Sequence, residues 1–487
     1  MRCILPENTP AFSAESFTRP LCVDLDGTLV KSDTLIDSLL VLMRTRPLRA
    51  LRLPGRLLHG KAAFKAFVTG EVNLDVHALP YNRPVLHYLQ EERRRGRQIY
   101  LATGADLRLA ERVAAHLGLF AGVLGSDGST NLTGSRKLAG LRARLGSGPF
   151  DYIGNDTPDM PMLAVAAEPM VANPSPSLCR SMKRRHIEPA RSFIEGRSLL
   201  ASLVKAIRVQ QWAKNLIIFI PLLLSHALST GKLLTAFAAF CCFSMAASSA
   251  YITNDLLDIE ADRRHPRKRS RPFASGDLRP FTGVCIAAVF LVAALVGSGF
   301  IGAAFHGWLV LYLVTTVAYT WLLKRFALID VLALSGLYIL RLLAGAAATG
   351  VTISHWLAGF SMFLFLSLAI VKRFAELENL RASQSAPRNG RGYQLIDLEQ
   401  LRAFGTASAY AAIVVLCIYI AGQDVTKLYR TPGLLWIMAP LMLLWLNRMW
   451  LLASRGKLED DPVAFALKDR QSLLIGLGVV IVVLLAL

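Results

Sequence analysis

Cysteine is scarce in this chain of 487 residues, and the seven cysteines are scattered without a CxxC pair or any spacing typical of metal ligands. That distribution excludes a disulfide framework and predicts reduced thiols. The first 17 residues lack a basic start followed by an apolar core, so we expect no cleavable signal peptide. Internal repeats and long low-complexity tracts are also missing, which excludes a repeat architecture.

Acidic residues are also few, with 34 Asp and Glu against 54 Lys and Arg, for a net charge of +20. A basic excess of this size is compatible with a nucleic-acid partner, but most of it lies next to apolar segments. Anionic lipid and phosphorylated substrates explain that position better. We therefore expect a membrane partner and no nucleic acid.

Apolar residues make up 53% of the chain and are concentrated beyond residue 210. They predict an all-α polytopic membrane domain behind a soluble front end, with nine transmembrane helices close to the ~20 residues that a bilayer core requires. The nine predicted spans are 214–229, 233–252, 281–301, 305–323, 328–349, 355–371, 402–421, 433–452 and 471–487.

The charged connections between these spans predict the orientation. Lys and Arg gather after the second, fourth, sixth and eighth spans, as in Arg263–Arg271 and Lys372–Arg373. Because cytoplasmic loops carry this excess, we expect the front domain in the cytoplasm and a location in the cell membrane.

Polar groups in the front end follow short apolar segments that are typical of strands. Asp24 and Asp26 follow the first, Thr103 follows the second, and the loop 154–159 follows the third, with Lys137 before it. Ligands of open α/β sheets bind at the carboxyl ends of the strands. The pattern predicts a Rossmann-like α/β domain with a phosphate and magnesium site.

The DxDGT motif at Asp24–Thr28 makes residues 18–175 resemble the haloacid-dehalogenase-like phosphatase superfamily. The resemblance implies that Asp24 is the nucleophile and Asp26 the general acid and base. It also implies that Thr103 and Lys137 hold phosphoryl oxygens. A catalytically inactive domain kept as a scaffold is the alternative.

The third motif of this front domain departs from the superfamily pattern. Many members place Asp directly after the glycine, whereas this chain has Asn155 followed by Asp156. The resemblance assigns magnesium to Asp24 and to this loop, and it leaves open which of the two loop residues reaches the metal.

The rest of the front end divides into three parts. Residues 1–17 form an N-terminal extension, about 31–96 a small helical cap, and 176–205 a basic linker to the membrane domain 206–487. In the cap, Arg49, Arg52 and Arg56 share one helical face, which fits contact with anionic lipid or, equally, a solvated charged face.

Three carboxylates stand at the end of the second span, at Asp255, Asp258 and Asp262, just before the basic cluster Arg263–Arg271. In a helix they fall within an arc of roughly 60°. Like charges at this spacing repel, and a divalent cation removes the repulsion. The motif predicts a diphosphate held by Mg²⁺ at the membrane edge. A solvated acidic cap is the alternative.

The motif Asn254–Asp262, together with the number of spans, makes residues 205–487 resemble the UbiA-type prenyltransferase superfamily. Four more segments resemble its decaprenyl-phosphate phosphoribosyltransferase branch: Gln211–Asn215, His265–Gly276, Lys372–Leu377 and Ala466–Arg470. That branch implies transfer of 5-phosphoribosyl from 5-phosphoribosyl diphosphate to a polyprenyl phosphate, with the front domain removing the 5-phosphate.

The resemblance also implies the site residues. Asp255, Asp258 and Asp262 act with Mg²⁺, and a set of polar and charged residues binds substrate. That set is Gln211, Lys214, Asn215, Asn254, Lys268, Arg269, Lys372, Arg373, Glu376 and Asp469. For the cations the alternative is topology alone, and for Asp469 it is a salt bridge with Arg470.

Two other functions fit the same motifs. One is a prenyltransferase that moves a prenyl group from a prenyl diphosphate to an aromatic or other small acceptor. The other is a non-catalytic lipid-binding membrane scaffold, against which the intact motifs argue. Asp330 and Arg341 are further candidates, because charged residues inside apolar spans are costly and usually functional.

Overall fold

The computed structural model describes residues 19–196, 198–226, 228–382, 391–458 and 461–487, so the predicted extension 1–17 lies outside the described residues. The chain forms two compact units. The front unit is Met1–Ile207 with Ile252–Cys285, and the membrane unit is Arg208–Tyr251 with Ile286–Leu487. The segment that carries the acidic motif therefore groups with the front unit.

The front unit contains a sheet of six parallel strands in the order β3-β2-β1-β4-β5-β6. The strands are β1 (Leu21–Val23), β2 (Ile99–Asp106), β3 (Gly122–Ser126), β4 (Asp151–Gly154), β5 (Pro169–Ala172) and β6 (Arg191–Phe193). Parallel strands joined by helices confirm the predicted α/β class.

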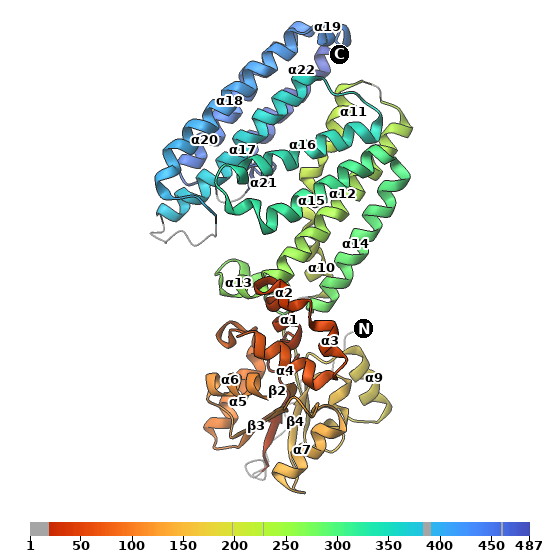
Figure 1. The fold of residues 1–487 in the computed structure, drawn as a ribbon, viewed down its shortest axis with the longest axis vertical. Coiled ribbons are helices and arrows are strands. Elements are labelled where there is room, and N and C mark those ends of the chain that lie inside the picture. The colour runs from red at the N-terminus through yellow and green to blue at the C-terminus, as the bar shows by residue number, and fades with distance from the viewer. Residues whose placement is uncertain (1–18, 197, 227, 383–390, 459–460) are drawn as a thin grey trace. The chain divides into compact units, whose positions relative to one another are not determined.

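Helices cover both faces of this sheet (Figure 1). Leu21 and Val23 pack in one core with α5 (Arg83–Arg94) and α6 (Leu107–Leu117). Cys22 between them packs in the other core with α7 (Ser135–Leu145) and α9 (Pro176–Arg184). This alternation is the two-residue period of a strand buried on both sides.

The cap consists of four helices: α1 (Thr34–Thr45), α2 (Pro47–Ala50), α3 (Leu53–Leu57) and α4 (Lys61–Glu71). Asp33 caps α1 by accepting from the backbone amides of Leu35 and Ile36. The predicted cap range reaches residue 96 and so includes α5, which lies in the same core as residues of β1, β2 and α1.

The stretch predicted as a linker, 176–205, has regular structure. It holds α9, the edge strand β6 and most of α10 (Leu199–Ile207). The front unit also includes η2 (Val76–Ala78), η3 (Thr157–Asp159), α8 (Met160–Leu163), α13 (Ile259–Arg264) and η5 (Lys268–Ser270). The proline and basic residues of the stretch 176–205 indicated a linker. In the structure Ser175 caps α9 and Pro176 opens it, as prolines do at helix starts.

Seven helices of the described chain are long and apolar enough to cross a membrane. Six are α12 (Thr230–Leu257), α14 (Pro280–Ile301), α15 (Ala303–Trp321), α16 (Ile329–Thr349), α17 (His355–Ala382) and α20 (Met438–Ser454) preceded by η8 (Pro432–Ile437). The seventh is α18 (Leu398–Ala421) preceded by η7 (Leu395–Asp397).

The predicted count of nine spans is therefore not confirmed. The first and ninth predicted spans match shorter apolar helices, Val209–Leu224 and Arg470–Ala486. The first consists of η4 (Val209–Phe219) and α11 (Ile220–Leu224), and the second is α22. Both fall short of the ~20 helical residues that a bilayer core needs. Counting apolar residues did not detect these helix boundaries.

The centre of the membrane unit is built by α12, α16 and α17, whose apolar windows are half buried, whereas those of α14 and α15 are mostly exposed. Small residues allow close packing there. A Cβ added to Gly345 of α16 would lie 2.1 Å from the carbonyl oxygen of Ile218, so only glycine lets η4 approach. The remaining elements are η6 (Leu323–Arg325), α19 (Gln423–Leu428) and α21 (Pro462–Ala466).

Candidate functional site

The front unit brings its predicted residues together at the carboxyl ends of β1, β2 and β4. Lys137 Nζ donates to Asp24 Oδ1 at 2.8 Å and to Asp159 Oδ1 at 3.0 Å, and all three side chains are buried. Tyr152 donates to the same Asp159 oxygen at 2.8 Å. The predicted nucleophile thus has an ammonium partner that is fixed by a second carboxylate.

Thr103 is buried within β2, two residues after Leu101, which pairs with Val23 in the register of the sheet. Its hydroxyl accepts from the Ala105 amide at 3.0 Å. Asp26 accepts from the Thr34 amide at 2.8 Å, which ties the motif loop to the start of α1.

The loop after β4 separates the two candidate metal ligands. Asn155 is buried, and its side-chain nitrogen occupies the space where a Cβ on Gly27 would lie, so it faces the DxDGT loop. Asp156 instead accepts from Ser175 Oγ at 2.7 Å and from the Thr157 amide. The contacts therefore favour Asn155 as the residue that reaches a metal beside Asp24.

Magnesium fits this donor set with help from other oxygens. Within the described ranges no three His, Cys, Asp or Glu side chains group closely enough to hold a metal ion alone. Mg²⁺ commonly binds one or two carboxylates and completes its shell with waters and substrate phosphate. Asp24, the Asn155 amide oxygen and a phosphoryl group would meet that requirement.

Burial raises the pKa values of the two carboxyl groups of the DxDGT motif. Burial raises the pKa of Asp24 to about 7, although Lys137 opposes the shift. Burial and the neighbouring Asp33 raise the pKa of Asp26 to about 8. Burial acts to lower the pKa of Lys137, but Asp24 and Asp159 outweigh it and the pKa lies above its ordinary value. Strongly shifted carboxyl groups beside a fixed cation are typical of catalytic sites.

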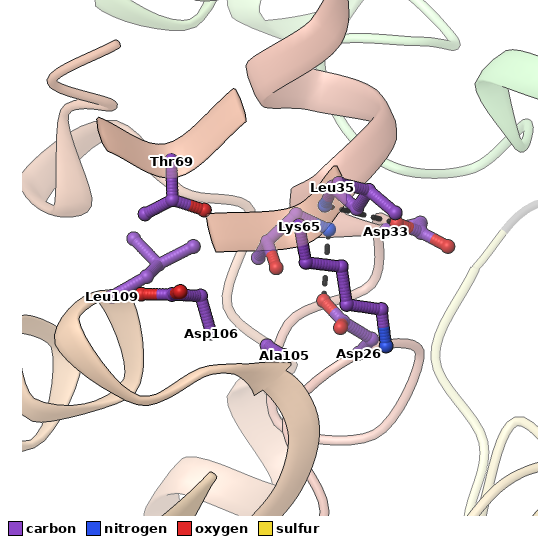
Figure 2. Close-up of a pocket in the computed structure, with 9 residues that line it drawn as sticks. Asp26, Asp33, Leu35, Lys65, Thr69, Ala105, Asp106 and Leu109 are labelled. Carbon is purple, nitrogen blue, oxygen red and sulfur yellow. Dashed lines mark hydrogen bonds between the residues drawn. The ribbon is translucent and has the colours of Figure 1, made fainter. Parts of the chain in front are cut away.

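A small cavity of about 60 Å³ opens beside Asp26 between the motif loop and the cap. Figure 2 shows Lys65 of α4 pointing toward Asp26, with Thr69 and Asp106 on the same lining. Lys65 Nζ donates to the carbonyl of Gly104 at 2.6 Å and to Asn131 at 2.8 Å. The cavity has room for a few waters only, so a larger substrate requires the cap to open.

The acidic motif is helical with a break at Asp258, which stands between α12 and α13 as the cap of α13. Asp255 and Asp262 are buried and share Arg271, whose Nη1 donates to them at 3.0 and 2.6 Å. Two carboxylates thus already converge on one cationic group. That arrangement fits the predicted Mg²⁺ position, with diphosphate oxygens completing the shell.

Other motif residues lie differently from the prediction. Asp258 is partly exposed and contacts Arg44 of the cap, rather than facing the same cation as its neighbours. Lys268 and Arg269 are exposed on η5, and the Asn254 carbonyl accepts from the Asp258 amide. Arg271, which was not predicted as a site residue, makes the contacts with Asp255 and Asp262.

In the membrane unit, Asp461 joins two predicted substrate-binding lysines. Lys214 and Lys372 donate to the same Asp461 oxygen at 2.8 and 3.0 Å, and Tyr338 donates to its other oxygen at 3.4 Å. Burial acts to raise the pKa of Asp461, but the two lysines outweigh it and hold the pKa well below its ordinary value. This carboxylate lies where an anionic substrate group would contact both lysines.

A second buried network surrounds Arg373 of α17. It pairs with Asp330 through two nitrogens, and Tyr319 accepts from Arg373 at 2.8 Å while donating to Asp330 at 2.8 Å. Glu376 accepts from Arg373 at 2.7 Å and also pairs with Arg391. Arg373, Asp330 and Glu376 thus neutralise one another within the network, which is the arrangement expected of buried ions.

Two more predicted residues have structural partners. Asn215 accepts from Arg341 Nε at 2.8 Å and donates to Ser244 at 3.0 Å, so it anchors the buried arginine. Asp469 caps α22 and pairs with Arg448, rather than with Arg470 as the alternative had it. Gln211 begins the same segment as Asn215 with a half-buried side chain.

Sequence reasoning missed Arg271, Asp461 and Tyr338 as members of these sites. Arg271 belongs to the basic run that was noted, but nothing in the run singles out one arginine. Asp461 is 247 residues from Lys214, and its only local signal is that it ends a short acidic run before Pro462.

Apolar helices of spanning length with charged residues buried among them define a multi-pass membrane protein. A family model described as the UbiA prenyltransferase family matches residues 216–468. The chain belongs to that family, and the resemblance carried by the acidic motif is confirmed.

Similar proteins extend this result. Uncharacterized protein y4nM of Sinorhizobium fredii is 35% identical over 94% of this chain and 89% of its own length. A decaprenyl-phosphate phosphoribosyltransferase of Mycobacterium tuberculosis is 31% identical over 58% of this chain and 92% of its own length.

Solved structures match each part separately. A UbiA homolog from Archaeoglobus fulgidus bound to GPP and Mg²⁺ covers 58% of this chain and 99% of that chain, with 13% identity and a TM-score of 0.45. A HAD family hydrolase from Salmonella enterica serovar Typhi covers 33% of this chain and 64% of that chain, with 16% identity and a TM-score of 0.25.

Proposed function

We propose that the protein transfers 5-phosphoribosyl from 5-phosphoribosyl diphosphate to a polyprenyl phosphate of the decaprenyl type, and that the front unit then removes the 5-phosphate. The relative from Mycobacterium tuberculosis carries the name of the first activity. The membrane would be the cell membrane, with the front unit in the cytoplasm.

The observation that supports this donor best is the pair of lysines in the membrane unit. Lys214 and Lys372 donate to one oxygen of Asp461, so a phosphate that displaced this carboxylate would contact both lysines. A 5-phosphoribosyl diphosphate carries a second phosphate besides its diphosphate, whereas a prenyl diphosphate carries an apolar tail in its place.

The transfer step needs little acid–base help. An oxygen of the polyprenyl phosphate attacks the anomeric carbon, and the bond from that carbon to the diphosphate breaks. Asp255 and Asp262 would hold Mg²⁺, which supplies charge neutralisation for the leaving group when bound. Lys214 and Lys372 would orient the donor, because positioning carries most of the rate when the nucleophile is already an anion.

The phosphatase step uses the front-unit site. The Asp24 carboxylate attacks phosphorus and the ester oxygen leaves, while Asp26 gives that oxygen a proton. Water then releases phosphate from Asp24, with Asp26 taking the proton back. A pKa of about 8 keeps Asp26 protonated at neutral pH, as a general acid requires. Lys137 and Thr103 would hold the phosphoryl oxygens.

Purified full-length protein tests the donor assignment directly. With radiolabelled 5-phosphoribosyl diphosphate, decaprenyl phosphate and Mg²⁺, label should enter the lipid phase. Lys372→Met should lower that rate by about tenfold or more, since one charge-assisted contact is lost, while Lys457→Met, an exposed lysine, should not. Label transfer from a prenyl diphosphate to an aromatic acceptor, with none from the ribosyl donor, would overturn the proposal.

A further inference from the structure

The cap carries an exposed surface that neither proposed reaction uses. It runs from Met43 to Lys61 and includes α2 and α3. We define it as the cap surface. Leu48, Leu51 and Leu58 expose 79%, 76% and 88% of their area, far more than core leucines do. Large apolar side chains that are turned outward together indicate an interaction surface.

The exposure is a feature of how this segment folds. Leu53 packs against the front-unit core, so the segment is anchored through one leucine while the leucines on either side point outward. Leu57 is also exposed, at 56%. The helices of the segment therefore fold with most of their apolar side chains away from the protein.

The charges of the cap surface all have one sign. Residues 43–61 contain five arginines and Lys61 and no Asp or Glu. Arg46 and Arg49 share the carboxylate of Glu71, and Arg44 pairs with Asp258, so two acidic residues offset part of the charge. Arg52 and Arg56 remain exposed, with Arg56 lying over the Phe67 ring at 5.0 Å.

We propose that the cap surface binds the headgroup region of an anionic lipid bilayer, with its leucines in the apolar boundary. Interleaved arginines and exposed leucines are the composition of interfacial segments. Each cation near an anionic leaflet is attracted to it, and each leucine removes apolar surface from water. The occupant is a bilayer rather than a protein because the described part of the chain carries helices that are long and apolar enough to cross one.

This contact has a consequence for the phosphatase site, which rests on the proposed function. The cap surface ends at Lys61, the first residue of α4, and α4 contributes Lys65 and Thr69 to the cavity beside Asp26. A cap held at the bilayer by its outer face is suited to a phosphate monoester that is attached to a lipid. The contact itself does not depend on that substrate.

Trypsin protection of full-length protein in nanodiscs tests the contact without any activity measurement. Discs of phosphatidylcholine alone are compared with discs that contain about one third phosphatidylglycerol. Cleavage after Arg52 and Arg56 should slow by about tenfold in the anionic discs and recover in about 0.5 M salt, which screens the attraction. Cleavage after Arg93 and Arg94 on α5 should proceed equally in both.

Leu51→Ser with Leu58→Ser should remove most of the protection and leave the melting temperature unchanged, because both side chains are exposed. Ile194→Ser, an exposed apolar residue outside the cap surface, is the matched control and should keep the protection. Equal cleavage in both kinds of disc would overturn the proposal. Protection in detergent that rises with protein concentration would also overturn it, since it would identify a second copy as the occupant.

Discussion

The two units hold their charged residues in different ways. In the front unit, Asp24 and Lys137 form a buried pair, and Asp26, two residues from Asp24, lines a small cavity. In the membrane unit, predicted substrate-binding cations are already paired with carboxylates of the protein, as Lys372 is with Asp461 and Arg373 is with Asp330. In both units a substrate anion must compete with a carboxylate of the protein, but the front-unit site adjoins a small cavity that the cap can enlarge by opening.

The difference follows from the surroundings. Charges that α-helices bury away from water must be neutralised within the protein, because an isolated charge there is very costly. At the edge of the front-unit sheet Asp24 is also buried and paired with Lys137, but the cavity beside Asp26 leaves room for a few waters. The following predictions separate the two units, from the largest expected effect to the smallest.

Asp255→Asn should lower phosphoribosyl transfer by about 100-fold or more, because it removes a magnesium ligand and one of the two partners of Arg271. Hydrolysis of a soluble phosphate monoester by the front unit should not change. Asp127→Asn, in an exposed loop, is the control. Both activities are measured on the same purified sample, and loss of both together would contradict separate sites.

Arg373→Met should destabilise the protein by about 3–5 kcal/mol, because it leaves Asp330 buried and unpaired. Adding Asp330→Asn should recover part of that loss. Thermal unfolding in detergent measures both, with Arg381→Met on the exposed end of α17 as the control. No difference between the Arg373 and Arg381 variants would show that the buried pair contributes little.

Asp461→Asn should tighten binding of inorganic pyrophosphate by about tenfold, because the carboxylate no longer competes for Lys214 and Lys372. The ligand-free protein should lose about 1–3 kcal/mol of stability, since two lysines are left without their shared acceptor. Isothermal titration and unfolding curves report the two effects, and Glu399→Gln is the exposed control. If the Asp461→Asn variant bound pyrophosphate more weakly than the wild-type protein, Asp461 would only hold Lys214 and Lys372 in place and would not compete with a substrate anion.

Magnesium affinity of the front unit should rise between pH 6 and pH 8.5. The pKa values of Asp24 and Asp26 are raised to about 7 and about 8, so both carboxyls must lose protons before they favour a cation. For the same reason the metal-free protein should lose stability as the pH rises from about 4 to about 8, because its folded state binds these protons more tightly than the unfolded chain. Titration in the Asp255→Asn background measures this, and Asp24→Asn should flatten the profile.

The front-unit site was the more predictable of the two. Strand ends can be recognised in sequence, and the sheet brings Asp24, Thr103 and the loop after β4 to one edge regardless of loop details. The boundary of the cap was less clear from the sequence, because the apolar residues of α5 have the same helical period as those of the cap helices.

The membrane unit was predictable as a family and as a set of apolar segments, but not in its contacts. Nothing local pairs Lys214 with Asp461, or Asn215 with Arg341, because helix packing decides which faces meet. The count of nine spans was not confirmed for a related reason, since hydropathy does not show where Val209–Leu224 and Arg470–Ala486 begin and end.

The most direct test of a two-step enzyme is the mass of the lipid product made by wild-type protein and by Asp24→Asn from 5-phosphoribosyl diphosphate and decaprenyl phosphate. Wild-type protein should release a lipid-linked ribose without its 5-phosphate. Asp24→Asn should transfer at the same rate and leave the 5-phosphate in place, because the front unit has lost its nucleophile. A dephosphorylated product from Asp24→Asn would contradict the account.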